Sequence, residues 1–126
     1  KNMDIYYNLG KLYKKRNDFD NTIKILEKAL TFEDDNPDTY FHLGEAHEKK
    51  GNTLEAIKYY RKAVKFFPSY SEAYFALGRL HMIECNKEKA ISNFAHALKI
   101  SSGYEEAIKD LGVLEDVDKY LENFDK

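Results

Sequence analysis

The chain has few of the residues that stabilise a small fold covalently or interrupt its helices. Its 126 residues include one cysteine, Cys85, no tryptophan, two prolines and six glycines. A single cysteine excludes an internal disulfide framework and favours a reducing compartment, so we expect a cytoplasmic location. The scarcity of proline and glycine leaves no flexible linker and no low-complexity segment. One continuous domain over residues 1–126 is therefore expected.

The chain also lacks a dominant charge and a long apolar run. Twenty basic residues and 22 acidic residues leave a net charge of -2, so the overall field does not attract nucleic acid or an anionic membrane. No run of about 18 or more apolar residues is present, which argues against a membrane-spanning helix, and no signal-peptide pattern follows Lys1. The chain does not begin with methionine, which also fits a segment of a longer protein.

What the chain does contain is a repeat of 34 residues. Apolar residues recur at spacings of three and four inside each unit, which is the periodicity of an amphipathic helix, so each unit is predicted to hold two helices. The Leu-Gly dipeptide occurs four times at this interval, at Leu9-Gly10, Leu43-Gly44, Leu77-Gly78 and Leu111-Gly112. The same phase is kept by Tyr6, Tyr40 and Tyr74, by Ile23, Ile57 and Ile91, and by Ala29, Ala63 and Ala97.

Residues that cap or end helices mark the boundaries of these elements. Asn17, Gly51 and Asn86 separate the two helices of a unit, and Pro37 suits the first turn of a helix. A glycine in the middle of a helix costs about 1 kcal/mol relative to alanine, so the repeated glycine predicts a close approach of two helices. We expect seven helices, near residues 3–16, 20–32, 37–50, 53–66, 71–84, 87–100 and 105–122.

These residues resemble the tetratricopeptide repeat (TPR), in which an aromatic residue, Leu-Gly and Tyr are followed by Ala, an aromatic residue, Ala and Pro. The second unit matches best, with Tyr40, Leu43, Gly44, His47, Ala56, Tyr60, Ala63 and Pro68. The third has Tyr74, Leu77, Gly78, His81, Ala90, Phe94, Ala97 and Ser102. The first has Tyr6, Leu9, Gly10, Tyr13, Thr22, Leu26, Ala29 and Asp34.

The resemblance implies an all-α fold, a right-handed superhelical stack of antiparallel helix pairs, or α-solenoid, with seven helices. Repeats one to three would occupy residues 3–36, 37–70 and 71–104, and a closing helix would occupy residues 105–124. As an alternative for the last stretch, Tyr120, Leu121 and Phe124 would belong to a truncated fourth repeat or dock on a neighbouring molecule.

The resemblance also implies that one face of each first helix lines a concave groove for an extended peptide or a partner helix. Residues two, five, nine and twelve of each repeat share that face, because spacings of three and four return to one side of a helix. The predicted groove residues are Tyr7, Lys11, Lys14, Phe41, Glu45, Glu48, Glu72, Phe75, Arg79, Met82 and Lys109. The same stripe includes Asp4, Asp38, Glu106, Val113 and Asp116.

Two rows within this stripe have competing explanations. Tyr7, Phe41 and Phe75 form an aromatic row, which we interpret as binding anchors, with packing between units as the alternative. Asp4, Asp38, Glu72 and Glu106 form an acidic row. The helix dipole favours acids in a first turn by about 0.3–1 kcal/mol, which explains the acidic row without a ligand.

The family's carboxylate clamp for the tails of Hsp70 and Hsp90 requires a set of Lys, Asn and Arg side chains. Its five positions hold Tyr7, Lys11, His42, Glu72 and Ala76 here, so the paired cations are missing and Glu72 would repel a carboxylate. No such clamp is therefore expected. The stripe has more acidic than basic residues, which favours a partner with hydrophobic anchors and a basic stretch near Glu45, Glu48 and Glu72.

We expect no catalysis, no metal and no cofactor. His42 and His47 are five residues apart, about 140° around a helix, and cannot form a ligand pair. We expect His47 and His81 to be partly buried packing residues, and His96 and Cys85 to have no catalytic role. The sequence thus predicts a protein-interaction module acting as adaptor, scaffold or co-chaperone, with self-association through the terminal helices as a further possibility.

Two other function classes stay open at this stage. The repeats could be the substrate-recruiting or regulatory segment of a larger enzyme, or a small chaperone that shields its partner. The charge balance disfavours RNA binding.

Overall fold

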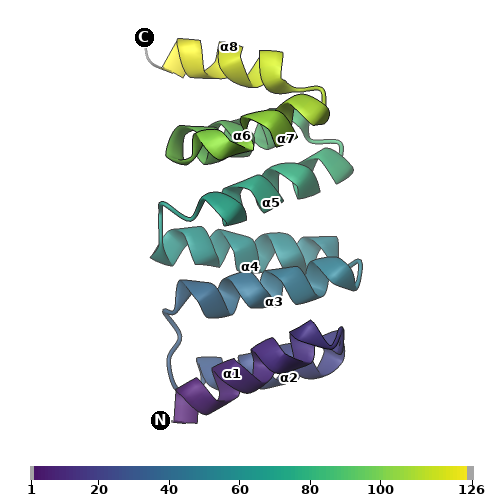
Figure 1. The fold of residues 1–126 in the computed structure, drawn as a ribbon, viewed down its shortest axis with the longest axis vertical. Coiled ribbons are helices and arrows are strands. Elements are labelled where there is room, and N and C mark those ends of the chain that lie inside the picture. Colours follow the sequence, from purple (N-terminus) through teal and green to yellow (C-terminus); the bar gives the residue numbers. More distant parts are fainter. Residues whose placement is uncertain (1, 125–126) are drawn as a thin grey trace. The chain divides into compact units, whose positions relative to one another are not determined.

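The computed structural model describes residues 2–124, and every regular element in that range is helical (Figure 1). The predicted all-α class is therefore confirmed for the described residues. In chain order the elements are α1 (Asn2–Lys15), α2 (Phe19–Leu30), α3 (Pro37–Lys49), α4 (Thr53–Phe66), α5 (Ser71–Ile83), α6 (Lys87–Ile100), a 3₁₀ turn η1 (Ser102–Tyr104), α7 (Glu105–Asp110) and α8 (Leu114–Phe124).

The chain divides into two compact units, an N-terminal unit of residues 1–68 and a C-terminal unit of residues 69–126. The predictions of one continuous domain and of a right-handed superhelix stay predictions. None of the described helices has the length and apolar content needed to cross a lipid bilayer.

The N-terminal unit consists of two helix hairpins, α1 with α2 and α3 with α4, and α2 packs against α3. The side chain of Asn36 caps α3, since its Oδ1 accepts hydrogen bonds from the backbone N–H groups of Asp38 (2.9 Å) and Thr39 (3.3 Å). Pro37 follows as the first helical residue, where its missing N–H costs nothing. The predicted start of the second repeat is thus correct in its cap and in its first residue.

The mid-helix glycines lie where two paired helices approach closely, as the repetition of glycine predicts. A Cβ atom added to Gly44 would lie 2.8 Å from the ring of Tyr60, inside van der Waals contact. Cβ atoms at Gly10 and Gly78 would collide with Leu26 and Phe94 in the same way. In each hairpin, therefore, a large side chain of the second helix lies directly against the glycine of the first.

The turns inside the three hairpins share one backbone geometry. Asn17, Gly51 and Cys85, at intervals of 34 residues, have positive φ angles of 60°, 81° and 60°. At Cys85 the chain closes with hydrogen bonds from Cys85 N to Met82 O (3.0 Å) and from Asn86 N to His81 O (2.8 Å). This is the Schellman arrangement, which usually places glycine at the left-handed position.

Replacing Cys85 with glycine should therefore stabilise the protein. A residue with a Cβ atom pays roughly 1–2 kcal/mol for the left-handed conformation, and glycine avoids it at an entropic cost of about 0.5–1 kcal/mol. The expected net gain is up to about 1 kcal/mol, or about 4 °C in Tm by differential scanning calorimetry. Cys85→Ser, which keeps the Cβ atom, is the matched control. If Cys85→Ser gained as much, the thiol and not the backbone would be responsible.

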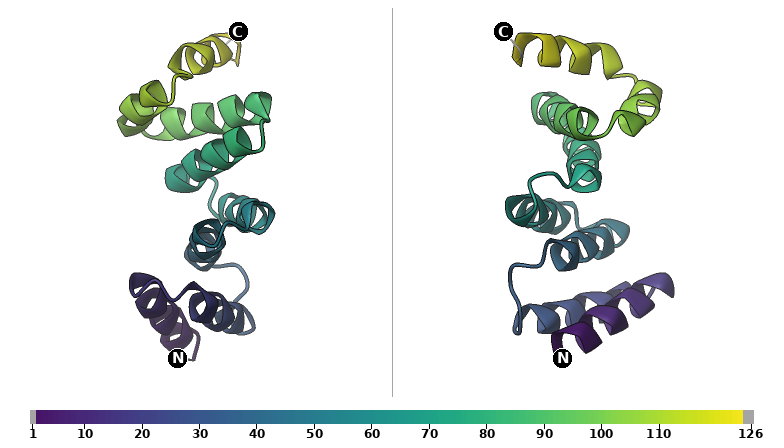
Figure 2. Two further views of the ribbon diagram at one scale, coloured as in Figure 1. Left: turned by 90° about the vertical axis from the view of Figure 1, so that its right-hand side faces the viewer. Right: turned by 60° about the vertical axis from the view of Figure 1, so that its left-hand side comes forward.

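In the C-terminal unit, the prediction of a single helix over residues 105–122 is wrong. α7 ends at Asp110, Gly112 has a φ of 79°, and the chain turns back into α8, so the described residues contain eight α-helices and not seven (Figure 2). The hydrogen bonds from Gly112 N to Lys109 O (2.9 Å) and from Val113 N to Ile108 O (3.5 Å) repeat the turn geometry of the hairpins. The fourth Leu-Gly dipeptide thus ends a helix, whereas the first three lie inside one.

α8 closes the C-terminal unit by packing on α6. Val117 of α8 and Ile108 of α7 are fully buried in one cluster with Phe94 of α6, and Tyr120 and Leu121 pack against that cluster. Tyr120 Oη also lies 3.3 Å from Ser92 Oγ of α6. The closing role predicted for this stretch is therefore performed by α8, and Tyr120 and Leu121 serve the core of their own unit. The side chain of Phe124 lies outside the described part of the chain.

Candidate protein-interaction site

Six predicted groove residues lie on α1 and α3 of the N-terminal unit. α1 carries Tyr7, Lys11 and Lys14 at spacings of four and three, which places them on one side of the helix. α3 carries Phe41, Glu45 and Glu48 in the same register. The two helices belong to one compact unit, so the face they share can be described from its contacts.

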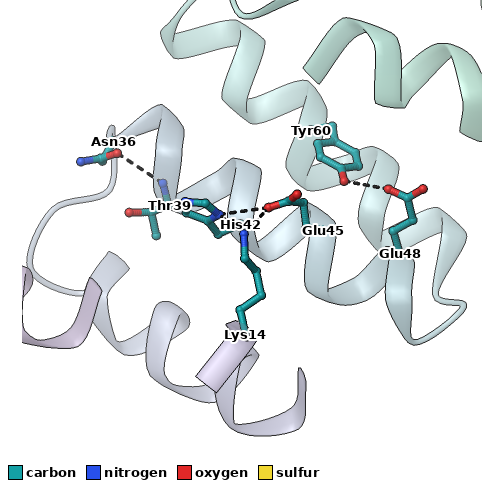
Figure 3. Close-up of polar contacts among 7 residues, drawn as sticks. All are labelled: Lys14, Asn36, Thr39, His42, Glu45, Glu48 and Tyr60. Atoms are coloured by element: carbon teal, nitrogen blue, oxygen red, sulfur yellow. Dashed lines mark hydrogen bonds and ion pairs between the residues drawn. The ribbon is translucent and has the colours of Figure 1, made fainter. Parts of the chain in front are cut away.

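A three-residue polar network connects the two helices on this face (Figure 3). The ammonium group of Lys14 lies 2.5 Å from Glu45 Oε1 and 2.6 Å from His42 Nδ1, and Nδ1 lies 3.0 Å from the same carboxylate oxygen. Because Lys14 has only donors, Nδ1 either accepts from Lys14 or donates to Glu45, and it does not do both at once. In either arrangement Glu45 is neutralised by a cation from the neighbouring helix.

The network also sets the ionisation of Glu45. Burial would raise the pKa of this carboxyl, but hydrogen bonds from His42 and Lys14 and the positive charge of Lys14 outweigh that effect and lower the pKa below its usual value. The carboxylate therefore stays ionised at neutral pH. A basic partner segment would have to compete with Lys14 for it.

Replacing Glu45 with glutamine should lower the free energy of unfolding at pH 7 by about 0.5–1 kcal/mol, the range of partly exposed ion pairs. The pKa of Glu45 is lower in the folded state, so its stabilising contribution is present above the unfolded-state pKa of about 4.5 and is lost as pH falls through the folded value. Urea unfolding curves of the two proteins should thus converge as pH decreases below about 4.

Glu84→Gln is the control for that comparison, because it makes the same change at an exposed glutamate. It should follow the wild-type curve across the same range. A Glu45→Gln effect that stayed constant with pH would contradict the assigned role of the charge.

The aromatic residues of this face are half-buried, and each ring packs against neighbouring rings. The ring centroid of Phe41 lies 5.4 Å from that of Tyr60 on α4 and 5.8 Å from that of His42. The Tyr60 hydroxyl donates a 2.8 Å hydrogen bond to Glu48, which fixes both side chains (Figure 3). Phe41 therefore packs within its own repeat, which differs from the packing between units considered as the alternative, and its ring is only partly buried.

Tyr7 lies on the same face of α1. Its ring centroid is 5.8 Å from that of His42, and the ammonium group of Lys11 lies 5.3 Å from it, within cation–π range. Burial and the charge of Asp38 raise the pKa of the Tyr7 hydroxyl, so it remains a neutral hydrogen-bond donor. His42 thus lies between the two aromatic residues of the face.

In the C-terminal unit the corresponding face belongs to α5. The Phe75 ring centroid lies 5.4 Å from that of Phe94 and 4.9 Å from that of Tyr104, and the guanidinium of Arg79 lies 5.6 Å from the Phe75 centroid. Met82 packs against the core cluster and lines a depression of about 200 Å³ together with Cys85, Lys87 and Val113.

Two further predicted groove residues, Glu72 and Lys109, belong to the C-terminal unit. Glu72 and Lys109 are exposed, on α5 and α7 respectively. The charge of Glu72 adds to the effect of burial in raising the pKa of the Tyr104 hydroxyl. Ala76, the fifth clamp position, is only 2% exposed.

The structure therefore brings the predicted residues together in two sets, one in each compact unit. A single groove continuous across both units stays a prediction. Two residues of these faces were missing from the predicted set, His42 and Tyr104. His42 was considered as a clamp position and as a metal ligand, and Tyr104 is the last residue of the predicted third repeat. An aromatic residue directly before a predicted helix was the signal available for Tyr104.

His47 is the histidine for which the structure tests the predicted packing role. His47 is buried and its ring stacks on Tyr59 at 5.4 Å, as expected for a packing residue. Within residues 2–124 no group of three or more His, Cys, Asp or Glu side chains is arranged to hold a metal ion.

Comparison with known families identifies the repeats. A TPR repeat model matches residues 10–51, and tetratricopeptide repeat models match residues 37–70 and 71–104, the ranges predicted for the second and third repeats. The chain belongs to the tetratricopeptide repeat family, with three repeats in tandem. This family is a protein-interaction fold.

Solved structures share the fold. A crystal structure of MamA aligns over 96% of this chain and 75% of that chain, with a TM-score of 0.82 and 23% sequence identity. The first TPR of Spaghetti (RPAP3), bound to the HSP90 peptide SRMEEVD, aligns over 95% and 93%, with a TM-score of 0.82 and 20% identity. A search of curated proteins found no match. At these identities the likeness shows the fold alone.

Proposed function

We propose that this chain is a non-catalytic interaction module that binds an extended peptide or a helix of a partner protein, and acts as an adaptor, scaffold or co-chaperone. The observation that carries the proposal is the half-exposed aromatic residue on each face, Phe41 on α3 and Phe75 on α5. Each ring packs against a buried aromatic neighbour, Tyr60 or Phe94, and is only partly buried. Aromatic side chains are among the residues that contribute most binding energy at protein interfaces.

The charges beside these anchors define the partner further. On the N-terminal face the Lys14–Glu45 pair is already satisfied, so it contributes little to a charged ligand. Lys11 lies next to Tyr7, and Glu48 is held by Tyr60. The partner segment would therefore bind mainly through apolar side chains, with the basic stretch proposed from the sequence limited to the vicinity of Glu48 and Glu72.

The same residues support the absence of a carboxylate clamp of the Hsp70 or Hsp90 type. Among the five clamp positions only Lys11 is a lysine or arginine, and Ala76 is buried. Lys14 forms an ion pair with Glu45, and the negative charge of Glu72 would repel an acidic tail. The peptide bound by the Spaghetti domain is acidic at its C-terminus, so SRMEEVD is a suitable negative probe for this chain.

The test is selection of peptides on the intact domain, followed by fluorescence anisotropy with the selected sequence. Phe41→Ala combined with Phe75→Ala should weaken binding at least tenfold, since anchors of this kind are worth about 2 kcal/mol or more. SRMEEVD should show no saturable binding. Phe32→Ala combined with Phe67→Ala, the same change at two exposed phenylalanines away from both faces, should leave the affinity unchanged.

Circular dichroism would verify the fold of each variant before binding is compared. Lys11→Glu is a second variant of the N-terminal face for the same affinity measurement. Lys11 is exposed, so its replacement does not disturb the core. Equal affinity of all variants would place the binding site elsewhere on the molecule and would reject this proposal.

A further inference from the structure

A cluster of four cations occupies the exposed side of α4. Lys58, Arg61, Lys62 and Lys65 recur at the three- and four-residue spacings that place side chains on one face of a helix. All four side chains are exposed, and together they line a depression of about 480 Å³. We call this surface the α4 basic face. It lies on a single helix of the N-terminal unit, so it is complete within that unit.

The 34-residue repeat does not require this cluster. The equivalent positions are of mixed charge in the first repeat and mostly uncharged in the third, and they hold Lys24, Glu27, Lys28 and Thr31, and Ser92, Ala95, His96 and Lys99. Only the second repeat has a cation at every one of these positions. The cluster is therefore a property of α4 and not of the repeat pattern.

The cluster is unfavourable for the helix that carries it. Like charges three or four residues apart repel one another on a helix. The face contains four such pairs, Lys58 with Arg61, Lys58 with Lys62, Arg61 with Lys65, and Lys62 with Lys65. Within residues 2–124 no carboxylate forms an ion pair with any of the four side chains. An anion bound across the face would relieve this repulsion.

Aromatic rings hold three of the four cations in place. The ammonium groups of Lys58 and Lys62 lie 5.6 Å from the ring centroids of Tyr59 and Tyr40, and that of Lys65 lies 5.4 Å from the centroid of Phe66. A cation–π contact restrains a lysine but leaves its charge and its N–H donors in place. Less conformational freedom is therefore lost when an anion binds.

We infer that the α4 basic face is a second interaction surface, which binds a short acidic segment of a partner protein. Seven residues of helix span about 10 Å, a length that a short run of aspartate or glutamate side chains matches. The guanidinium of Arg61 is suited to bidentate binding of one carboxylate, and the lysines supply point charges around it. Exposed cations are stable in water, so the face needs no cover from the chain itself. It is distinct from the faces that hold Phe41 and Phe75.

The chain's own carboxylates limit the size of the occupant. Acidic residues lie beside two of the rings under the cations, Glu27 and Glu55 beside Tyr59, and Asp34 and Asp35 beside Tyr40. A nucleic acid or an anionic membrane presents negative charge over a wide area and would meet these carboxylates as well. A short acidic segment covers the cations alone, so it avoids that repulsion.

The test measures binding of fluorescein-labelled octaglutamate to the intact domain by anisotropy. Binding should be saturable at low salt and should weaken as salt is added, because the Debye length falls to about 10 Å at 0.1 M. SRMEEVD, in which an arginine offsets three acidic side chains, should remain below saturation over the same range.

Arg61→Glu combined with Lys62→Glu should weaken octaglutamate binding about tenfold, since it replaces two attractions with two repulsions. The same double substitution converts all four like-charge pairs of the face into opposite-charge pairs. The Tm of this variant should therefore be at least that of the wild type, so weaker binding would not reflect a damaged fold.

Arg16→Glu combined with Lys89→Glu is the matched control, because it makes the same change in net charge at exposed residues outside α4. This control, and the Phe41→Ala with Phe75→Ala variant, should bind octaglutamate as the wild type does. Absence of saturable binding, equal loss in the control, or equal affinity for octaglutamine would overturn the inference. Equal or tighter binding of octauridylate, or of vesicles containing phosphatidylserine, would overturn it in favour of an extended polyanion.

Discussion

Replacing Phe94 with alanine should reduce the free energy of unfolding by about 3–5 kcal/mol, the cost of removing a fully buried aromatic side chain. Phe94 is 0% exposed and lies where three elements of the C-terminal unit meet. Its ring covers Gly78 of α5, contacts Phe75 at 5.4 Å between centroids, and packs with Ile108 and Val117. Guanidinium unfolding followed by circular dichroism measures the loss. Phe94→Leu, with a smaller cavity, gives a graded value if the alanine variant does not fold.

The contact between Phe94 and Gly78 also predicts that Gly78→Ala changes the free energy of unfolding in opposite directions in the wild type and in the Phe94→Ala variant. In the wild type an alanine here would press its Cβ atom into the ring, with Cγ of Phe94 only 2.9 Å away, and overpacking of this kind costs about 1–3 kcal/mol. In the Phe94→Ala background the ring is gone, so Gly78→Ala should instead stabilise α5 by up to about 1 kcal/mol through helix propensity. A double-mutant cycle measures this coupling directly.

Gly10→Ala provides the comparison within the same repeat position. Its Cβ atom would meet Cγ and Cδ2 of Leu26, whose aliphatic side chain is more flexible than the ring of Phe94. The penalty at Gly10 should therefore be smaller than at Gly78. Additive effects of Gly78→Ala and Phe94→Ala would contradict the assigned contact.

The repeat period predicted the fold well because each of its residues has a local physical reason. The glycines predicted close helix pairs, and each of the three meets a large side chain of its partner helix. Asn36 and Pro37 predicted a helix start, and the cap hydrogen bonds form there. The constant 34-residue spacing was therefore sufficient to predict six of the helices.

The same reasoning failed at Gly112 because a Leu-Gly dipeptide does not determine its own conformation. In the first three repeats the helix continues past the glycine, and a second helix covers it. At Gly112 a Cβ atom would meet nothing within 4 Å, so no helix packs there, and the glycine is free to adopt its positive φ. Whether glycine serves packing or a turn depends on tertiary contacts that the dipeptide does not encode.

Helical spacing predicted which helix carries each candidate residue, but it did not predict how these residues pair. Lys14 lies on α1 and Glu45 on α3, yet spacing along a helix contains no measure of the distance between two helices. Their ion pair, and the insertion of His42 beside it, depend on that distance. A charge count over the stripe therefore overestimated how much acidic surface is available to a partner.

The second large effect concerns α8. Val117→Asp places a carboxylate at a position that is 0% exposed, in an apolar cluster with Ile108 and Phe94. Burial of an unpaired charge costs several kcal/mol, more than one short helix gains from its contacts. We expect α8 to detach rather than bury the charge, with a loss of at least about 3 kcal/mol in the stability of the C-terminal unit.

Hydrogen exchange distinguishes detachment from general unfolding, because the two predict different amide patterns. Detachment should remove protection in residues 114–124 and expose the surface of α6 around Ser92, which Tyr120 contacts, while α1 to α4 keep their protection. Asp118→Val, one residue further on the exposed side of α8, should leave exchange unchanged. Uniform loss of protection through α5 and α6 would instead mean that the closing helix is part of the cooperative core, and that the C-terminal unit has no stable form without it.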